Sequence, residues 1–506
     1  MSGLDPTFVD LPFRRLGDAA LSRARALGVS HADFRFERVR YQSLSVRDGV
    51  LQNASDTEDL GFSVRVIHRG AWGFASGVLL TPEEAVRVAE TAVAVAEVAA
   101  TMTSTPVQIA DEPIYPDATW VSSYEINPLE VSVSEKSALL VDWTERLRRG
   151  TAVDHARAYC EQVQENKYYA DLAGTSTTQQ RVRLMPGFEA MGAGADTFDS
   201  MTSIAPPAGR GWEYLRSVAE GGVYDWDAEL AEVPDLLDEK LKAPSVQGGT
   251  YDLVIHPSNL WLTIHESIGH ATELDRALGY EANYAGTSFA TPDLLGSLQY
   301  GSDVMHVTGD RTVEHGLASV GYDDEGVATQ SWDIVRDGRF VGYQLDRPMG
   351  VMLPGVDRSN GCAYADSPGH IPIQRMANVS LQPDRGPAPA STDDLIGKVE
   401  DGLYVVGDKS WSIDMQRFNF QFTGQRFYRI KDGELAGQVR DAAYQATTTD
   451  FWRSMEAVGG PDTWELGGAF NCGKAQPGQV AAVSHGCPTS LFRQVRILNT
   501  LEEGSA

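Results

Sequence analysis

Two histidines five residues apart, in the segment His265-Glu266-Ser267-Ile268-Gly269-His270, constrain the local fold of this chain more than any other feature. The strand-like run 251–255, followed by Pro257 at a position that suits the first turn of a helix, places the segment on a helix. In a regular α-helix, residues five apart lie about 140° apart around the axis and cannot bind one tetrahedral ion. A single π-bulge would bring them onto nearly one face, and Gly269 tolerates such a distortion. A shared metal ion therefore predicts a π-bulge here.

Glu266 directly follows the first histidine, which is a suitable position for a catalytic base. Zinc lowers the pKa of its bound water to roughly 7, and a neighbouring carboxylate can take the proton as the hydroxide attacks a carbonyl. A catalytic zinc generally has three protein ligands and one open position, so a third ligand must lie elsewhere in the chain. The candidates are Glu273, Asp275, Cys472 and Cys487. Spacing alone does not choose among them, because the two carboxylates could instead orient a histidine and either thiol could be an inert core residue.

Length and charge exclude several classes of protein. A chain of 506 residues exceeds the roughly 250 to 300 residues of a single core, which predicts two or three domains. The 42 Lys and Arg against 70 Asp and Glu give a net charge of −28, which should repel nucleic acid and anionic lipid. The start of the chain has no apolar signal region, no run of about 18 apolar residues occurs, and the four cysteines are too few for a disulfide framework. We therefore expect a cytoplasmic protein that binds neither nucleic acid nor membrane.

The order of helix and strand signals predicts three domains, at 1–112, 113–246 and 247–502. The first begins with a helix that Gly28 ends, continues with strands around the turn Asp48-Gly49, and has a helix that starts at Thr81-Pro82-Glu83-Glu84. The second opens with an amphipathic helix after an irregular stretch that contains several prolines. The N-terminal domain is thus expected to be a mixed α/β unit, followed by a middle segment.

The last domain shows hairpin signals at Asp337-Gly338 and Asp432-Gly433, each between two strand-like runs. These turns predict a mostly antiparallel, β-rich domain that carries the histidine helix. The fold class expected for the whole chain is therefore α+β.

Four motifs together resemble the TldD/PmbA family of zinc metallopeptidases, and specifically its catalytic TldD-like subunit. His265 to His270 is similar to the family's H-E-x-x-x-H, and Pro372 to Asn378 is similar to its P-x-x-R-M-x-N. Cys472-Gly473-Lys474 resembles its C-G-K element, and Gly486-Cys487-Pro488-Thr489 resembles its G-Q-P-T. The chain departs from the pattern at Cys487, where glutamine is common. The resemblance extends over most of the chain.

The resemblance implies that His265, His270 and Cys472 bind one Zn2+ per catalytic chain and that Glu266 is the catalytic base. It implies peptide-bond hydrolysis in short or unfolded peptides, as proteolysis or leader-peptide processing. It also implies a dimer, either a heterodimer with a metal-free PmbA/TldE-like paralogue or a homodimer. The alternative is a non-catalytic, peptide-binding or assembly subunit of such a heterodimer, which the loss of His265 or Glu266 would have favoured. A purely structural zinc site would instead have four protein ligands.

Overall fold

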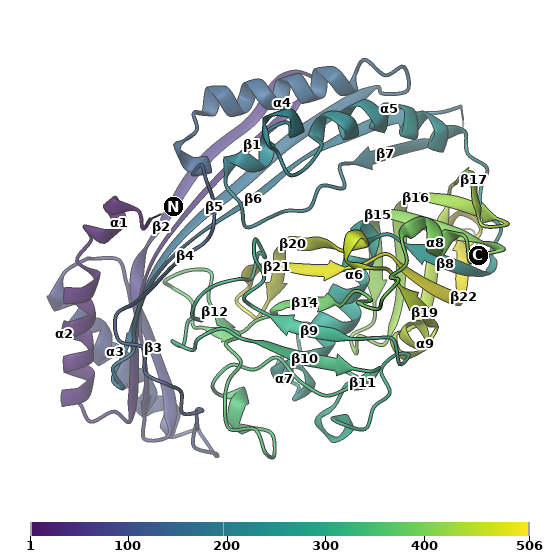
Figure 1. Ribbon diagram of the computed structural model, residues 1–506. Helices are drawn as coiled ribbons and strands as arrows, with labels where there is room; N and C mark the ends of the chain where they lie inside the picture. Colours follow the sequence, from purple (N-terminus) through teal and green to yellow (C-terminus); the bar gives the residue numbers. More distant parts are fainter. Residues whose placement is uncertain (1–2, 196, 504–506) are drawn as a thin grey trace.

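A seven-stranded sheet with long strands arches over one side of the molecule (Figure 1). The computed structural model describes residues 3–195 and 197–503. Four of the strands have 17 to 19 residues, against a usual length of about 5 to 6. In spatial order the sheet contains β3 (Ala71–Gly77), β2 (Val50–His68), β1 (His31–Arg47), β5 (His155–Asp171), β6 (Ser176–Ala193) and β4 (Ala118–Val121), and β7 (Phe198–Thr202) pairs with β6.

The predicted turn at Asp48-Gly49 is confirmed, with φ of 51° and 80° at its two residues. It joins β1 and β2, whose antiparallel pairing runs from Arg47 opposite Val50 to His31 opposite Ile67. The sequence indicated strands on either side of the turn but not their length. The polar, largely exposed middle of β2 is nonetheless extended, because its backbone pairs with β1 along the whole length.

Helices pack on this sheet in two groups, and each group covers its own hydrophobic core. Near one end lie α1 (Pro6–Val9), α2 (Phe13–Ala26) and α3 (Pro82–Ala100), and near the other lie α4 (Val133–Leu147) and α5 (Trp226–Lys242). The predicted start of α3 is confirmed, since the Thr81 side chain accepts a hydrogen bond from the Glu84 N–H. Strands β1 and β5 contribute side chains to both cores. The chain segments on the two sides of residue 112 therefore form one continuous sheet, joined by the pairing of β1 with β5.

The C-terminal half is built on a closed ring of strands beneath the arch (Figure 1). Its order is β15 (Asp401–Ile413), β8 (Gly249–Ile255), β22 (Ser490–Asn499), β18 (Ala442–Thr447) and β16 (Asn419–Lys431), and β16 pairs back to β15. Strand β17 (Glu434–Val439) extends the sheet at β16, and β19 (Met455–Val458) pairs with β22. Only the β8–β15 pairing in this described sheet is parallel. The predicted α+β class, with a mostly antiparallel C-terminal domain, is confirmed.

Smaller sheets and short helices surround this ring. One sheet has the order β11 (Arg339–Phe340), β10 (Ser331–Arg336), β9 (Val307–Asp310) and β14 (Asn378–Leu381), and the two-stranded pairs are β12 (Ala363–Tyr364) with β13 (Ile373–Gln374) and β20 (Glu465–Lys474) with β21 (Gln479–Cys487). The short helices are α7 (Leu274–Ala277), α8 (Thr392–Ile396), α9 (Thr448–Arg453) and α10 (Thr500–Glu503). Helix α6 (Pro257–Ile264) packs between β15 and the β20–β21 ribbon. This position brings the histidine segment next to Cys472.

Buried ion pairs join the arch to the C-terminal half. Arg65 on β2 lies 2.8 Å from Glu325, and Lys167 on β5 lies 2.7 Å from Asp324. Buried charges are tolerated only when they are paired, so these contacts specify how the arch is placed. Among the helices of the described residues, none combines the length and the apolar character needed to cross a membrane.

Candidate metal centre

Helix α6 runs directly into the predicted π-helical turn, which is confirmed at His265–Gly269. The backbone N–H of His270 donates to the carbonyl of His265, five residues earlier. A glycine is also needed here for packing, because a Cβ on Gly269 would lie only 2.5 Å from the sulfur of Met376. The wider turn places both imidazole rings on one face of the helix, with their centroids 4.7 Å apart.

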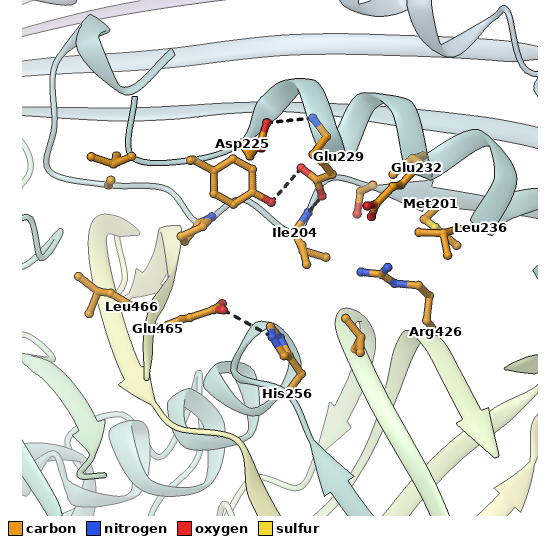
Figure 2. Close-up of a pocket in the computed structure, with 18 of the residues that line it drawn as sticks. Met201, Ile204, Asp225, Glu229, Glu232, Leu236, His256, Arg426, Glu465 and Leu466 are labelled. Carbon is orange, nitrogen blue, oxygen red and sulfur yellow. Dashed lines mark hydrogen bonds and ion pairs between the residues drawn. The ribbon is translucent and has the colours of Figure 1, made fainter. Parts of the chain in front are cut away.

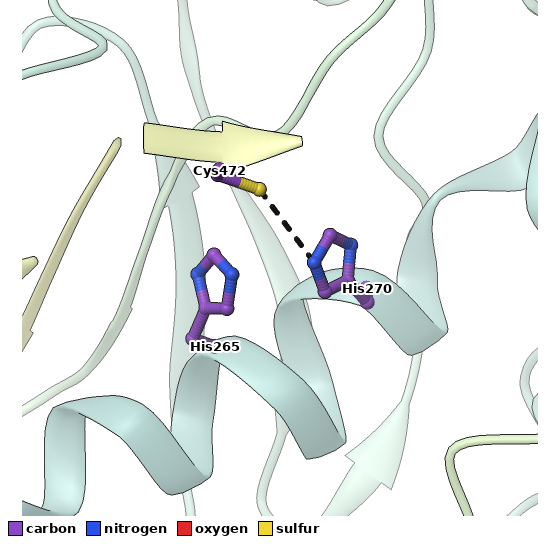
Figure 3. A group of neighbouring side chains, drawn as sticks. All are labelled: His265, His270 and Cys472. Atoms are coloured by element: carbon purple, nitrogen blue, oxygen red, sulfur yellow. Dashed lines mark hydrogen bonds between the residues drawn. The ribbon is translucent and has the colours of Figure 1, made fainter. Parts of the chain in front are cut away.

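Cys472 on β20 completes a group of three possible ligands with these histidines (Figure 3). The ligand atoms of the three residues all lie within 4.8 Å of one another, and the Cys472 Sγ is 3.6 Å from the His270 Nε2. A tetrahedral zinc with ordinary bond lengths separates a nitrogen and a sulfur ligand by about 3.6 Å. All three residues are buried, at 5–6% exposed. The donor types and their spacing therefore fit a zinc ion.

The pKa directions of the four cysteines single out Cys472. Burial raises the pKa of Cys160 and Cys362 to about 12 and that of Cys487 well above its usual value. Burial is also the largest influence on Cys472, but the nearby His270 and Arg375 outweigh it and lower the pKa of this thiol. Cys472 is thus the thiol most ready to bind a metal as thiolate. The Cys487 Sγ instead faces the carbonyl of Pro257, at 3.7 Å.

Glu273 and Asp275, the carboxylate candidates for a third ligand, have other partners. The Nδ1 of His270 lies 2.9 Å from the Glu273 Oε2, so its N–H donates to that carboxylate. Lys474 donates to Glu273 at 3.0 Å and to Asp275 at 2.8 Å. Burial opposes the ionisation of Glu273, yet Lys474 and His270 hold the pKa of this carboxyl well below its usual range. Glu273 therefore orients His270 with its Nε2 toward Cys472, an arrangement common in metal sites.

Glu266, the predicted base, lies on the π-helical turn beside the ligand group. It is buried, and its Oε2 accepts a hydrogen bond from the Arg417 Nη1 at 2.8 Å. Arg417 has a φ of 62° in the turn between β15 and β16, a conformation that is strained for a residue other than glycine. Such strain is concentrated at functional sites, and here it is associated with the guanidinium that holds Glu266.

Sequence reasoning missed two residues of this centre. The Nδ1 of His265 lies 2.7 Å from the Nε2 of His485, which is fully buried on β21. The only signal for His485 was its position directly before Gly486-Cys487-Pro488-Thr489. Arg417 had no signal, because its role depends on the backbone of a turn far along the chain.

Arg375 also contributes to this centre. It binds the backbone carbonyls of Cys472 and Gln479, so it positions the strand that carries the cysteine.

A cavity of about 990 Å³ lies apart from the ligand group, whose residues do not line it (Figure 2). It lies between α5 and the strands of the C-terminal half. His256, which caps the start of α6, lines this cavity. His265 lies at the other end of the same helix and does not line it. The metal centre and the cavity are therefore two separate sites.

Comparisons with known proteins find metalloproteases among the relatives of this chain. The chain is 27% identical over 481 residues to a metalloprotease of Methanothermobacter thermautotrophicus, a match that covers 94% of this chain and 96% of the relative. It is 22% identical over 484 residues to the zinc metalloprotease TldD homolog of Saccharolobus solfataricus, covering 94% and 98%. The TldD homolog of Haemophilus influenzae is 24% identical over 485 residues, covering 93% of each chain.

Solved structures share the fold at low sequence identity. A putative modulator of a DNA gyrase from Thermotoga maritima matches with a TM-score of 0.75 at 17% identity, covering 96% of this chain and all of that one. TldE from Thermococcus kodakarensis matches with a TM-score of 0.72 at 16% identity, covering 95% and 99%. Models of the PmbA/TldA metallopeptidase domain 1 and C-terminal domain match residues 32–96 and 248–499. From these domains and relatives, the chain belongs to the TldD/PmbA family.

Proposed function

We propose that the chain is a cytoplasmic, zinc-dependent peptidase that hydrolyses peptide bonds in short or unfolded peptides. The observation that carries this proposal is the 3.6 Å separation of the Cys472 Sγ and the His270 Nε2, with His265 in the same group. Two nitrogens and a thiolate suit zinc better than magnesium or calcium, which prefer oxygen ligands. The names of the relatives as metalloproteases, one of them a zinc metalloprotease, support the same reaction class.

In the proposed reaction, His265, His270 and Cys472 would hold the zinc, which would supply Lewis-acid chemistry and make the attacking water more acidic. The Glu266 carboxylate takes the proton from the attacking water and later gives it to the leaving amine. Arg417 holds the Oε2 of Glu266, and we assign the proton transfer to the other oxygen, Oε1. Because the guanidinium fixes the carboxylate, Glu266 needs little reorganisation during proton transfer.

The burial of the ligand group supports a preference for short or unfolded peptides. Each ligand residue is only 5–6% exposed, which favours an extended, narrow segment over the surface of a folded protein as the substrate. We further propose that the chain acts as a dimer, either with a PmbA/TldE-like homologue or with a second copy. The shared fold with TldE supports a pairing of two similarly shaped chains.

Two measurements on the purified chain test this function. Elemental analysis should find about one zinc per chain, and an unfolded peptide library should be cleaved by the chain alone or together with its homologue. Glu266→Gln provides the matched control, since the amide cannot accept the proton. An active preparation without any transition metal would overturn the zinc assignment. Peptide binding without cleavage, in the presence of bound zinc and of the homologue, would favour a non-catalytic binding subunit instead.

A further inference from the structure

In the cavity of Figure 2, two carboxylates on one wall face a guanidinium on the other, and that second wall also carries Glu465 beside His256. Glu229 and Glu232 enter from α5, whereas Arg426 enters from β16. The remaining surface between them includes the apolar and aromatic side chains Met201, Tyr224, Leu236, Tyr404 and Leu466. A volume of about 990 Å³ is at the upper end of the size range of small-molecule sites.

Arg426 forms no ion pair with Glu229 or Glu232 among the described residues, whereas Glu465 lies 3.5 Å from His256. The Nε of Arg426 is buried and has no hydrogen-bond partner among the described residues, and the side-chain partner of this guanidinium is the neutral Tyr428. Glu229 accepts hydrogen bonds from the Ile204 N–H at 2.6 Å and the Tyr224 hydroxyl at 3.0 Å, which are both neutral donors. Burial raises the pKa of Glu229 to about 7, although Arg426 opposes the shift, so a ligand ammonium beside this carboxyl would favour its charged form.

We propose that this cavity binds an amino acid or short peptide with both ends free, pairing its carboxylate with Arg426 and its ammonium with Glu229 and Glu232. A guanidinium binds a carboxylate through two parallel hydrogen bonds, and the apolar walls accommodate side chains of the ligand. The site is separate from the metal centre, whose residues do not line the cavity, so this inference does not depend on the proposed peptidase activity.

Calorimetric titration of the full chain with amino acids, dipeptides and tripeptides tests the site, using Glu266→Gln to prevent turnover. Free peptides or amino acids should bind, and acetylation of the amine or amidation of the carboxylate should each weaken binding about tenfold or more. Arg426→Gln should cause a similar loss, whereas Arg429→Gln, on the same strand but paired with Asp401, should not. Binding should persist in Cys472→Ala. Equal binding of free and blocked ligands, unchanged binding in Arg426→Gln, or no binding by any member of the panel overturns the proposal.

A second and independent observation concerns the proton on His265. The Nδ1 of His485 lies 2.8 Å from the carbonyl oxygen of Val379, which can only accept, so this nitrogen carries a hydrogen. In neutral His485 the other nitrogen, Nε2, is then an acceptor. The Nδ1 of His265, at 2.7 Å, must donate to it. This chain of two bonds leaves the Nε2 of His265 with a free lone pair.

The geometry points to His485 as a positioning residue that holds His265 in the tautomer able to bind a metal through Nε2. Glu273 has the equivalent role for His270, so each histidine is oriented by a different partner. The consequence for metal binding depends on the proposed zinc centre. The tautomer itself depends only on the hydrogen bonds of the chain.

His485→Gln and His485→Leu separate positioning from packing. Glutamine offers an oxygen to the His265 N–H and an N–H to the Val379 carbonyl, whereas leucine offers neither. In the metal-free chain labelled with ¹⁵N-histidine, NMR should show His265 protonated at Nδ1 in the wild type and in the Gln variant. In the Leu variant, NMR should show a mixture of the two His265 tautomers. Chelator competition should show a 10- to 100-fold loss of zinc affinity for Leu and a smaller loss for Gln.

Protonation of His265 at Nε2 in the wild type overturns this inference, as does full zinc affinity in the folded Leu variant. If the wild type binds no zinc at all, the proposed function fails, while the NMR result still decides the tautomer.

Discussion

Replacing Cys472 with alanine is the sharpest test of the metal centre, because the chain provides a matched control in Cys487. Both thiols are buried, both lie on the β20–β21 ribbon, and only the Cys472 Sγ lies 3.6 Å from the His270 Nε2. Zinc binding to protein sites is worth roughly 10 to 16 kcal/mol in total. An equal share for each of three ligands makes the loss in Cys472→Ala about 3 to 5 kcal/mol, or on the order of 10²- to 10⁴-fold in affinity.

The assay is competition for zinc between each variant and a chelator of known affinity at neutral pH. Circular dichroism and thermal unfolding should first show that both variants are folded, since loss of a buried thiol destabilises by about 1 kcal/mol in either case. Cys487→Ala should keep the wild-type affinity. If Cys487→Ala lost zinc while Cys472→Ala kept it, the ligand group seen here would not be the metal site.

Three further predictions follow from named contacts. Glu266→Gln should retain zinc but lose on the order of 10²-fold or more in kcat, because an amide cannot take a proton; wild-type turnover would remove Glu266 from the mechanism. Glu273→Gln should weaken zinc binding by about 10- to 100-fold in the same chelator competition, because an amide accepts the hydrogen bond from the His270 Nδ1–H less strongly than a carboxylate does. Unchanged zinc affinity would show that Glu273 does not orient His270. Burial opposes the ionisation of Asp33, but Arg65 outweighs it and lowers the pKa of Asp33 to about 2, from a usual 3.8. This shift stabilises the fold by about 2 kcal/mol above pH 4, a contribution that is lost as the pH falls toward 2. Denaturant unfolding of Asp33→Asn should thus show a shallower loss of stability over that interval, and parallel pH profiles would refute the assignment.

Local features of the fold were predictable because they depend on residues close together in the chain. The five-residue spacing of His265 and His270, with Gly269 between them, required a π-bulge, and the structure has one. The Asp-Gly turns at 48–49, 337–338 and 432–433 joined paired strands, because these residues adopt the positive φ that such turns need.

The lengths of the arch strands were not predictable, because the polar middle of β2 has no strand signal of its own. Its extended conformation comes from pairing with β1, and the pairing of β1 with β5 joins segments more than a hundred residues apart. For the same reason, a boundary placed at residue 112 from local signals could not show that one sheet crosses it.

The sequence by itself determined which residue types could bind a metal and that the two histidines share one helical face. The residue spacing left the third ligand open and only the family resemblance implied Cys472. The tertiary structure is what brings this thiol to the histidines, because Cys472 is 202 residues from His270, on a strand where its immediate neighbours are exposed. The β20–β21 pairing is irregular between Ala469 and Cys472, and a shift of one residue would turn the thiol to the opposite face. His485 and Arg417 are further cases, since their contacts depend on strand register and on a strained turn. Such long-range geometry is set by the packing of the whole domain and leaves no local pattern in the sequence.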